Sequence, residues 1–317
     1  MSLRIIGTGR SLPDFLLSNE KLSTMLDTSD EWIVSRTGIK NRHISTVETL
    51  SDLAAKAAGE AISNAKVLPS EIDLIIATTI GGEYLTPSLA CVIQKRIGAV
   101  CPAFDINAAC TGFIYALNTA KAYFDSAMAK KILIVSAEMM SSYVDWKDRS
   151  SCVLFGDGSG AVLLEKGNNL LEITVSATGD EDLLKIGGMK GNNPFSTKQA
   201  ESPFLQMNGK DVFKFAVSSM CNDIGLVLEK AGLTMNDIKK VIPHQANMRI
   251  INFAKEKLGI PDDKIVSAID RFGNTSSASI PILLAELIEN KELKTGDLVV
   301  LAAFGGGLTN GACIIKI

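Results

Sequence analysis

Cys110 is the residue of this sequence best suited to nucleophilic chemistry. It lies in the segment Asp105-Ile106-Asn107-Ala108-Ala109-Cys110-Thr111-Gly112-Phe113, between an expected strand and an expected apolar helix over residues 111–125. The N-terminus of a helix favours the thiolate, the reactive form of cysteine, through the helix dipole and unpaired backbone N–H groups. The alternative is a small buried hydrophobic residue, the usual place of a free cysteine. Cys110 is therefore a candidate nucleophile.

Two further polar residues occupy turns at which chemistry is expected in an α/β protein. His244 follows the expected strand 240–242, and the chain has only one other histidine, His43, so a reactive cysteine has few bases available. Asn274 lies in a turn that enters another helix. Turns after strand ends are the usual position of active-site residues in open α/β sheets. The alternatives are a histidine satisfied by backbone hydrogen bonds and an ordinary Asn helix cap.

Three consecutive glycines, 305–307, follow the last expected strand. Glycines there would let a backbone N–H face a ligand, as an oxyanion hole requires, although a plain tight turn has the same composition. The pair Gly7 and Gly9 lacks the third glycine of the dinucleotide fingerprint, so dinucleotide binding is not expected. The turn 156–158 carries one carboxylate, Asp157, which is too few ligands for a metal site.

The composition narrows the class of protein. The chain has 317 residues, of which 46% are hydrophobic, and a formal charge of -3, which excludes disorder and gives no basic surface for nucleic acid. No apolar run is long enough for a membrane span, and the start has no secretory signal, so membrane insertion is not expected. Six cysteines without a C-x-x-C pair argue against a zinc site or disulfides and predict a reducing, cytoplasmic location.

A faint internal duplication organises the chain. Residues 70–77 resemble 236–243, and 131–137 resemble 297–303, and both pairs are separated by 166 residues. Residues 160–164 also resemble 311–315, at a separation about 15 residues shorter, so we expect an insertion in the first half between Ala137 and Gly160. The prediction is two halves, 1–167 with Cys110 and 168–317 with His244 and Asn274.

Apolar strand-like runs alternate with helix-like segments in each half, which predicts a mostly parallel sheet covered on both faces. Two such units give an α/β fold with a layered α/β/α/β/α body. The Gly-rich stretch 179–202 is expected to be one long loop, and such loops are often functional.

Taken together, these motifs resemble the β-ketoacyl-acyl-carrier-protein synthase III family of thiolase-like condensing enzymes, over essentially the whole chain. The resemblance rests on seven segments: 27–33, 36–39, 108–113, 155–158, 243–247, 273–276 and 305–307. Related synthases that elongate longer chains have a second His where this sequence has Asn274. The resemblance implies the duplicated five-layer thiolase-like sandwich.

The family's chemistry follows from the same resemblance. Cys110 would take an acyl primer from acyl-CoA, with the backbone N–H groups of Cys110 and Gly306 as oxyanion hole. His244 and Asn274 would then stabilise decarboxylation of malonyl-acyl carrier protein, whose carbanion attacks the acyl group. The implied products are a β-ketoacyl-acyl carrier protein, CoA and CO2, the initiation of type II fatty acid synthesis, and no cofactor is required.

The resemblance also implies contacts with substrates and partners. Trp32 and Arg149 would sandwich the CoA adenine, with Thr28 beside it, Arg36 near the phosphates and Asn247 on the pantetheine arm. Basic residues beside this mouth would attract an acidic acyl carrier protein, among them Lys239 and Lys240. The expected docking residues are Gln245, Ala246, Asn247, Met248, Arg249 and Lys214.

The resemblance also makes Thr86 relevant to which acyl primers can be accepted. Some members of the family have a large aromatic here that reaches into the acyl pocket of the partner subunit of a homodimer. The smaller Thr86 predicts room for primers longer or more branched than acetyl.

Three other functions remain compatible with the sequence. The nearest is a related Cys-His-Asn condensing enzyme or acyltransferase of specialised metabolism. A Cys-His thioesterase would form the same acyl-enzyme but hydrolyse it, and a non-catalytic binding module would only keep the fold.

Overall fold

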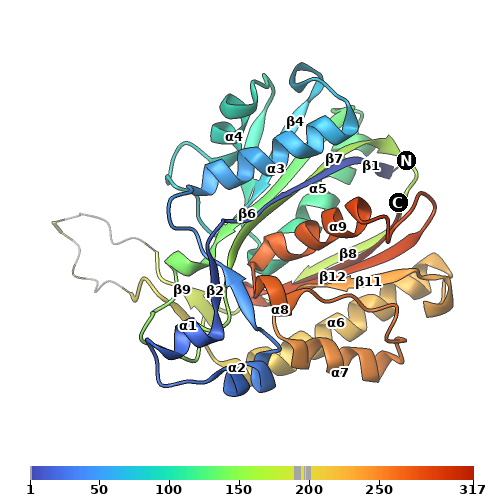
Figure 1. Cartoon of the computed structure of the whole chain (residues 1–317). Coiled ribbons are helices and arrows are strands. Elements are labelled where there is room, and N and C mark those ends of the chain that lie inside the picture. The colour runs from blue at the N-terminus through green and yellow to red at the C-terminus, as the bar shows by residue number, and fades with distance from the viewer. Residues whose placement is uncertain (1, 189–193, 196, 198–200) are drawn as a thin grey trace.

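Two mixed β-sheets, with helices between them and on both outer faces, form five layers in the computed structural model (Figure 1). The structure describes residues 2–188, 194–195, 197 and 201–317. The first sheet has the strand order β1 (Ser2–Ser11), β7 (Asp157–Gly167), β6 (Lys131–Met139), β4 (Leu74–Thr78) and β5 (Ala103–Ile106). The second sheet has the order β11 (Lys240–Pro243), β12 (Leu298–Gly305), β13 (Thr309–Lys316) and β8 (Leu170–Ala177).

The expectation of mostly parallel sheets was wrong. Among the described strands, the parallel pairs are β4 with β5, β4 with β6, and β11 with β12. The remaining neighbours in both sheets pair antiparallel. The turn between β12 and β13, formed by η6 (Gly306–Leu308), accounts for one of these pairs, because a parallel crossover needs a dozen or more residues.

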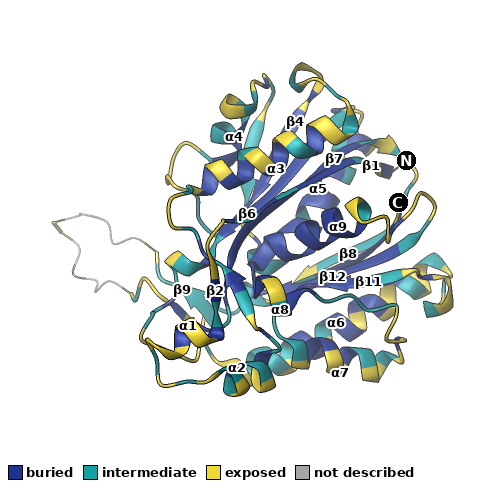
Figure 2. Cartoon of the chain, viewed as in Figure 1, coloured by how far each residue is buried: buried dark blue, intermediate teal, exposed yellow. Residues whose placement is uncertain are grey.

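Helices fill the three remaining layers. The outer face of the first sheet is covered by α3 (Leu50–Ala65) and α4 (Leu89–Ile97), and that of the second sheet by α6 (Gly209–Ala231) and α7 (Met248–Leu258). Between the sheets lie α5 (Gly112–Asp125) and α9 (Ser279–Glu289), which are buried along most of their length (Figure 2). The five-layer thiolase-like arrangement expected from the sequence is thus present.

Small residues bring the outer layer close to the first sheet. Helix α3 buries Ala54, Ala57 and Ala61, a three- and four-residue spacing that places them on one face. Gly7 and Gly9 of β1 lie against this face, and a Cβ at either glycine would collide with a backbone carbonyl of α3. The two glycines therefore serve helix packing.

The two sheets carry related turns at the ends of related strands. In the first half, η2 (Ala109–Thr111) precedes α5, and in the second half η5 (Ser276–Ala278) precedes α9, 167 residues later. The connection from β6 to β7 spans residues 140–156 and includes η3 (Met140–Ser142), whereas β12 and β13 are joined by η6 alone. The extra segment lies where the insertion was expected. We keep 1–167 and 168–317 as the proposed halves, since the sheets divide between Gly167 and Leu170.

A smaller hydrophobic cluster lies at one end of the sheets. Its elements are β2 (Leu16–Ser18), β3 (Asn41–His43), α1 (Asn19–Ser23), α2 (Asp30–Thr37), α8 (Ile269–Phe272), β9 (Leu184–Ile186) and β10 (Leu205–Met207). The pairing of β9 with β10 corrects the expectation of one long loop over 179–202, because β9 lies inside that stretch. Residues 189–193, 196 and 198–200 of the stretch lie outside the described residues.

Two short turns complete the described structure: η1 (Pro69–Glu71) and η4 (Met235–Asp237). Within the described ranges, no helix has both the length and the apolar character needed to cross a membrane.

Candidate active site

A cavity of about 1180 Å³ opens where the two sheets meet the smaller cluster. Cys110, His244, Asn274 and Gly306 all line it. They come from different elements: Cys110 from η2, His244 from the turn after β11, and Asn274 from the turn before η5. The fold thus brings together candidate residues that lie far apart in the sequence.

Cys110 sits against the C-terminal end of β12. A Cβ added to Gly305 would lie 2.7 Å from the backbone nitrogen of Cys110, so glycine is required for the two segments to approach this closely. Burial raises the pKa of the Cys110 thiol to about 12, and the nearby Glu138 carboxylate adds to the rise. The raised pKa runs against the expectation that the helix N-terminus would favour a thiolate, because desolvation disfavours the charged form of the thiol, which is protonated at neutral pH in the free protein.

His244 is held rigidly and is neutral. Its side chain is buried, and its Nδ1 lies 2.8 Å from Oγ of Ser279 in the first turn of α9. The Phe304 ring packs edge-on against the imidazole, with ring centroids 5.4 Å apart. Burial lowers the pKa of His244 to about 3, so the ring is uncharged at physiological pH.

Asn274 is oriented by its own turn. Its Oδ1 accepts a hydrogen bond from the Ser276 backbone N–H at 2.9 Å. Its backbone N–H donates to the Leu154 carbonyl at 2.9 Å, and its carbonyl accepts from the Gly156 N–H at 3.1 Å. Because Oδ1 is occupied, the side-chain NH2 group is the end of Asn274 left to donate to a ligand.

Glu138 and Ser276 are polar residues beside Cys110 that the sequence reasoning missed. Ser276 Oγ lies 3.4 Å from Cys110 Sγ and 3.1 Å from Glu138 Oε1, and both residues are buried. Burial raises the pKa of Glu138 to about 7. One signal was available, since an acidic residue in the otherwise apolar run 131–139 must bury its carboxylate or disrupt the strand.

At the mouth of the cavity, two guanidinium groups contact the Trp32 ring. The Cζ atom of Arg36 lies 4.9 Å from the Trp32 ring centroid and that of Arg149 lies 5.2 Å from it. Arg149 is also hydrogen-bonded to the Asp27 carbonyl. Thr28, next in sequence, has a buried Oγ1 without a hydrogen-bond partner. Trp32 and Arg36 line the cavity, whereas Asp27, Thr28 and Arg149 are not among its lining residues.

One expected docking residue must be withdrawn. Gln245 is 2% exposed, and its amide donates to the Pro243 carbonyl and accepts from Ser267 and Ala268. These hydrogen bonds hold the side chain inside the protein, so the Gln245 amide is not available to contact a macromolecule.

The remaining docking candidates lie on or near the start of α7 and on α6. Asn247 caps α7 by accepting from the Arg249 N–H at 2.9 Å, and Ala246 and Met248 are partly exposed. Arg249 is exposed, with its guanidinium 5.7 Å from the Phe213 ring centroid, and it lines the cavity. Lys214 is also exposed, and it pairs with Asp211 at 2.9 Å.

Thr86 lies in the exposed connection between β4 and α4. Its neighbours Tyr84 and Leu85 line the cavity, whereas Thr86 itself is not among the lining residues of this chain.

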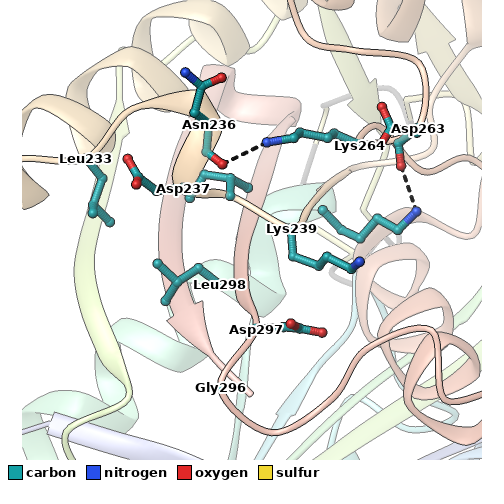
Figure 3. Close-up of a pocket in the computed structure, with 11 residues that line it drawn as sticks. Leu233, Asn236, Asp237, Lys239, Asp263, Lys264, Gly296, Asp297 and Leu298 are labelled. Atoms are coloured by element: carbon teal, nitrogen blue, oxygen red, sulfur yellow. Dashed lines mark hydrogen bonds between the residues drawn. The ribbon is translucent and has the colours of Figure 1, made fainter.

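Lys239 and Lys240 are not beside the mouth. They line a second, shallow hollow at the N-terminal end of β11, the end opposite to His244. Lys240 Nζ donates to the Asp263 carbonyl at 2.7 Å. Lys264 Nζ donates to the Asn236 carbonyl at 3.0 Å, and Figure 3 shows this bond together with Lys239. The expectation was wrong because the two ends of a strand lie at opposite ends of the sheet. Lys240 begins β11, whereas His244 follows its last residue, Pro243.

No three His, Cys, Asp or Glu side chains in the described part of the chain are grouped so as to hold a metal ion.

Comparison with known proteins finds relatives whose descriptions agree with one another. Two family models match this chain: 3-oxoacyl-[acyl-carrier-protein (ACP)] synthase III over residues 104–179, and the C-terminal part of the same family over residues 228–317. The chain is 47% identical to the β-ketoacyl-[acyl-carrier-protein] synthase III of Clostridium acetobutylicum, over 99% of this chain and 98% of that protein.

Solved structures agree in fold. The crystal structure of 3-oxoacyl-[acyl-carrier-protein] synthase III from Aquifex aeolicus VF5 superposes with a TM-score of 0.93 at 45% identity, covering all of both chains. A priming β-ketosynthase from the R1128 polyketide biosynthetic pathway also has a TM-score of 0.93, at 33% identity, covering all of this chain and 96% of that one.

Proposed function

This chain belongs to the 3-oxoacyl-[acyl-carrier-protein] synthase III family, and we propose that Cys110, His244 and Asn274 carry out its reaction. It is an acyltransferase, a condensing enzyme that joins an acyl primer to a malonyl unit at the start of type II fatty acid synthesis. The observation that carries the assignment of residues is that all three side chains line one cavity together with Gly306.

In the first half-reaction, Cys110 Sγ attacks the thioester carbon of an acyl-CoA. The C–S bond to CoA breaks, and the acyl group stays on Cys110 as a thioester. The backbone N–H groups of Cys110 and Gly306 stabilise the tetrahedral oxyanion. The close approach of Gly305 to the Cys110 nitrogen supports this, because it sets the two backbone segments side by side.

In the second half-reaction, His244 and Asn274 donate hydrogen bonds to the thioester oxygen of malonyl-acyl carrier protein. When the Ser279 hydroxyl donates to Nδ1 of His244, the neutral ring carries its proton on Nε2 and can donate from there. The NH2 group of Asn274 is the second donor. Loss of CO2 leaves a carbanion that attacks the acyl group on Cys110 and releases its thiolate. No cofactor takes part in these bond changes.

The mouth is proposed to bind CoA. The Trp32 ring and the Arg149 guanidinium would part to take the adenine between them, and Arg36 would pair with phosphate. The partnerless Oγ1 of Thr28 supports this, since a buried hydroxyl without a partner is costly unless a ligand supplies one. Asn247 would contact the pantetheine arm, which must pass it to reach Cys110.

The acidic acyl carrier protein is proposed to dock around Arg249. Arg249 is exposed at the cavity edge, and Ala246, Asn247 and Met248 beside it are partly exposed. Lys214 on α6 would add positive charge, although its pairing with Asp211 reduces the effect.

We propose a homodimer that pairs through the edge of the first sheet. Strand β5 is at that edge and pairs only with β4 in the described structure. Val100, three residues before it, is 90% exposed, and Leu85 in the β4–α4 connection is 83% exposed. An unpaired edge with exposed apolar side chains is a typical association surface. In such a dimer Thr86 would face the partner's acyl pocket and leave room for longer or branched primers.

The six cysteines are free thiols, which supports a reducing compartment, the cytoplasm.

One product analysis separates the candidate functions. The enzyme is given an acyl-CoA and malonyl-acyl carrier protein, and CoA, CO2 and the carrier-bound product are measured. Equal amounts of CoA, CO2 and β-ketoacyl carrier protein support the condensing function. Release of CoA and free fatty acid without CO2 would identify a thioesterase. The likeness to a priming polyketide ketosynthase favours one variant of the first outcome, a primer chosen for specialised metabolism, which a panel of acetyl-, isobutyryl- and hexanoyl-CoA would reveal.

A further inference from the structure

Ser276 connects the reactive sulfur to a buried carboxylate. Its Oγ lies 3.4 Å from Cys110 Sγ on one side and 3.1 Å from Glu138 Oε1 on the other. Ser276 is fully buried and has a positive φ of 48°, a conformation that residues with a side chain rarely adopt. The turn holds it there through the bond from its N–H to Asn274 Oδ1.

Glu138 is stabilised by neutral donors. Its Oε1 accepts from Ser277 Oγ at 2.6 Å as well as from Ser276 Oγ, and its Oε2 accepts from the Ile80 N–H at 3.0 Å. Thr79 Oγ1 is a further donor at 3.4 Å. Such a site can hold the carboxylate in either protonation state, because hydroxyl groups can turn to donate or to accept.

The Ser276 hydroxyl has one proton, which it can donate either to Cys110 Sγ or to Glu138 Oε1. While Glu138 is ionised, that proton is best donated to the carboxylate, and the Ser276 oxygen then accepts the S–H of Cys110. Once the sulfur is a thiolate, the Ser276 hydroxyl must donate its hydrogen bond to the sulfur. This is possible only if Glu138 is protonated and no longer accepts from Ser276. The protonation states of Cys110 and Glu138 are thus coupled through one oxygen.

We propose that Ser276 passes the thiol proton of Cys110 to Glu138 when the nucleophile forms. The S–H bond breaks as a new O–H bond forms on Ser276, and the original Ser276 proton moves to Glu138 Oε1. The result is a thiolate, an intact serine and a neutral carboxylic acid. The proton stays on Glu138 while Cys110 carries the acyl group and returns by the same route when condensation releases the thiolate. The idea rests on Cys110 being the nucleophile of the proposed function.

His244 is poorly suited to this step. Burial lowers the pKa of His244 to about 3, and its Nδ1 is engaged with Ser279. Burial instead raises the pKa of Glu138 to about 7, which makes it the stronger base of the two. The titratable groups in the field of Glu138 are the thiol of Cys110 and the phenol of Tyr143, both neutral at physiological pH with raised pKa values.

The duplicated turn shows that the hydroxyl is not needed for the fold. In the first half, the Ala109 N–H donates to Asn107 Oδ1 at 3.2 Å, and Ala109 has a φ of 46°. Ala109 is thus the counterpart of Ser276, 167 residues earlier, and makes the same turn with a methyl group. Ser276→Ala should therefore fold.

The test is the pH dependence of Cys110 alkylation by iodoacetamide in the full chain, read from the Cys110 peptide by mass spectrometry. Wild type should show a rise in rate with an inflection near neutral pH. Ser276→Ala should lose this inflection and react about tenfold more slowly at pH 7. An unchanged profile in Ser276→Ala would overturn the proposal.

Ser277→Ala is the matched control. It removes the shortest contact to Glu138 but none to the sulfur, so the inflection should persist and move to higher pH, because the ionised carboxylate loses a donor. If Ser277→Ala abolished the inflection as Ser276→Ala does, the effect would be structural and the relay would be wrong. Glu138→Gln should also lose the inflection, and if it fails to fold, the two serine variants decide.

Acylation by acetyl-CoA, measured on the same samples, distinguishes a failure of the proton relay from a failure of the proposed function. A wild type that shows the inflection without acylation would contradict the proposed function and leave the relay standing.

Discussion

The backbone N–H of Ser276 donates to Oδ1 of Asn274 at 2.9 Å and thereby fixes which end of the Asn274 amide faces the cavity. The same turn occurs at Asn107 and Ala109 in the first half, with a bond of 3.2 Å. In the first half the turn positions Cys110, and in the second half it leaves the NH2 group of Asn274 free to donate. One local structure, used twice, therefore positions both the proposed nucleophile and the proposed donor for the second substrate.

Asn274→Ala should slow decarboxylation of malonyl-acyl carrier protein by about 100-fold, the effect of losing one oriented donor. Acylation of Cys110 should be much less affected, because the amide acts on the second substrate. Rates of CO2 release and of Cys110 acylation, measured separately, check this. Condensation at the wild-type rate would show that the assigned role is wrong.

Gly305→Ala should reduce kcat by about 100-fold, because the new Cβ would lie 2.7 Å from the Cys110 nitrogen and push the nucleophile out of place. Gly225→Ala is the control: it lies in α6 with no heavy atom within 4 Å of the added Cβ. It should keep full activity and raise the free energy of unfolding by about 0.5–1 kcal/mol. Steady-state kinetics and urea unfolding measure both, and equal activity of the two variants would contradict the account.

Arg249→Glu should raise the KM for malonyl-acyl carrier protein about tenfold and weaken its salt dependence, since the docking charge is reversed. The turnover of a small malonyl thioester should change little. Lys239→Glu makes the same charge change in the hollow at the opposite end of β11 and should have no such effect. A comparable loss in both variants would point to net charge rather than to a docking site.

His244 should make the protein less stable in acid. Burial lowers its pKa from 6.5 to about 3, so between these pH values the unfolded chain binds a proton at this residue that the folded chain does not. The free energy of unfolding therefore falls as the pH drops through this window. His244→Gln lacks the site, and its stability relative to wild type should rise by roughly 1.4 kcal/mol per pH unit below pH 6.5. Urea unfolding at pH 7, 5.5 and 4.5 measures this, and parallel curves would refute a buried neutral histidine.

The sequence predicted the layers and singled out Cys110, His244 and Asn274, which line one cavity, because each lies in a local pattern of a strand, a turn or a helix start. It did not predict the environment of those residues. Two partners of Glu138, Ser276 and Ser277, lie 138 and 139 residues away, and the burial of Gln245 depends on Ser267 and Ala268, so neither environment follows from local periodicity. The raised pKa of Cys110 likewise depends on packing from both halves.

The central claim is that Cys110 carries the acyl primer between two substrates. Its most direct test is to mix the enzyme with acetyl-CoA alone, digest it and weigh the Cys110 peptide. The account predicts the mass of one added acetyl group on that peptide, absent from Cys110→Ser and lost again when malonyl-acyl carrier protein is added. An unmodified Cys110 peptide, or an acetyl group on another residue, would contradict it.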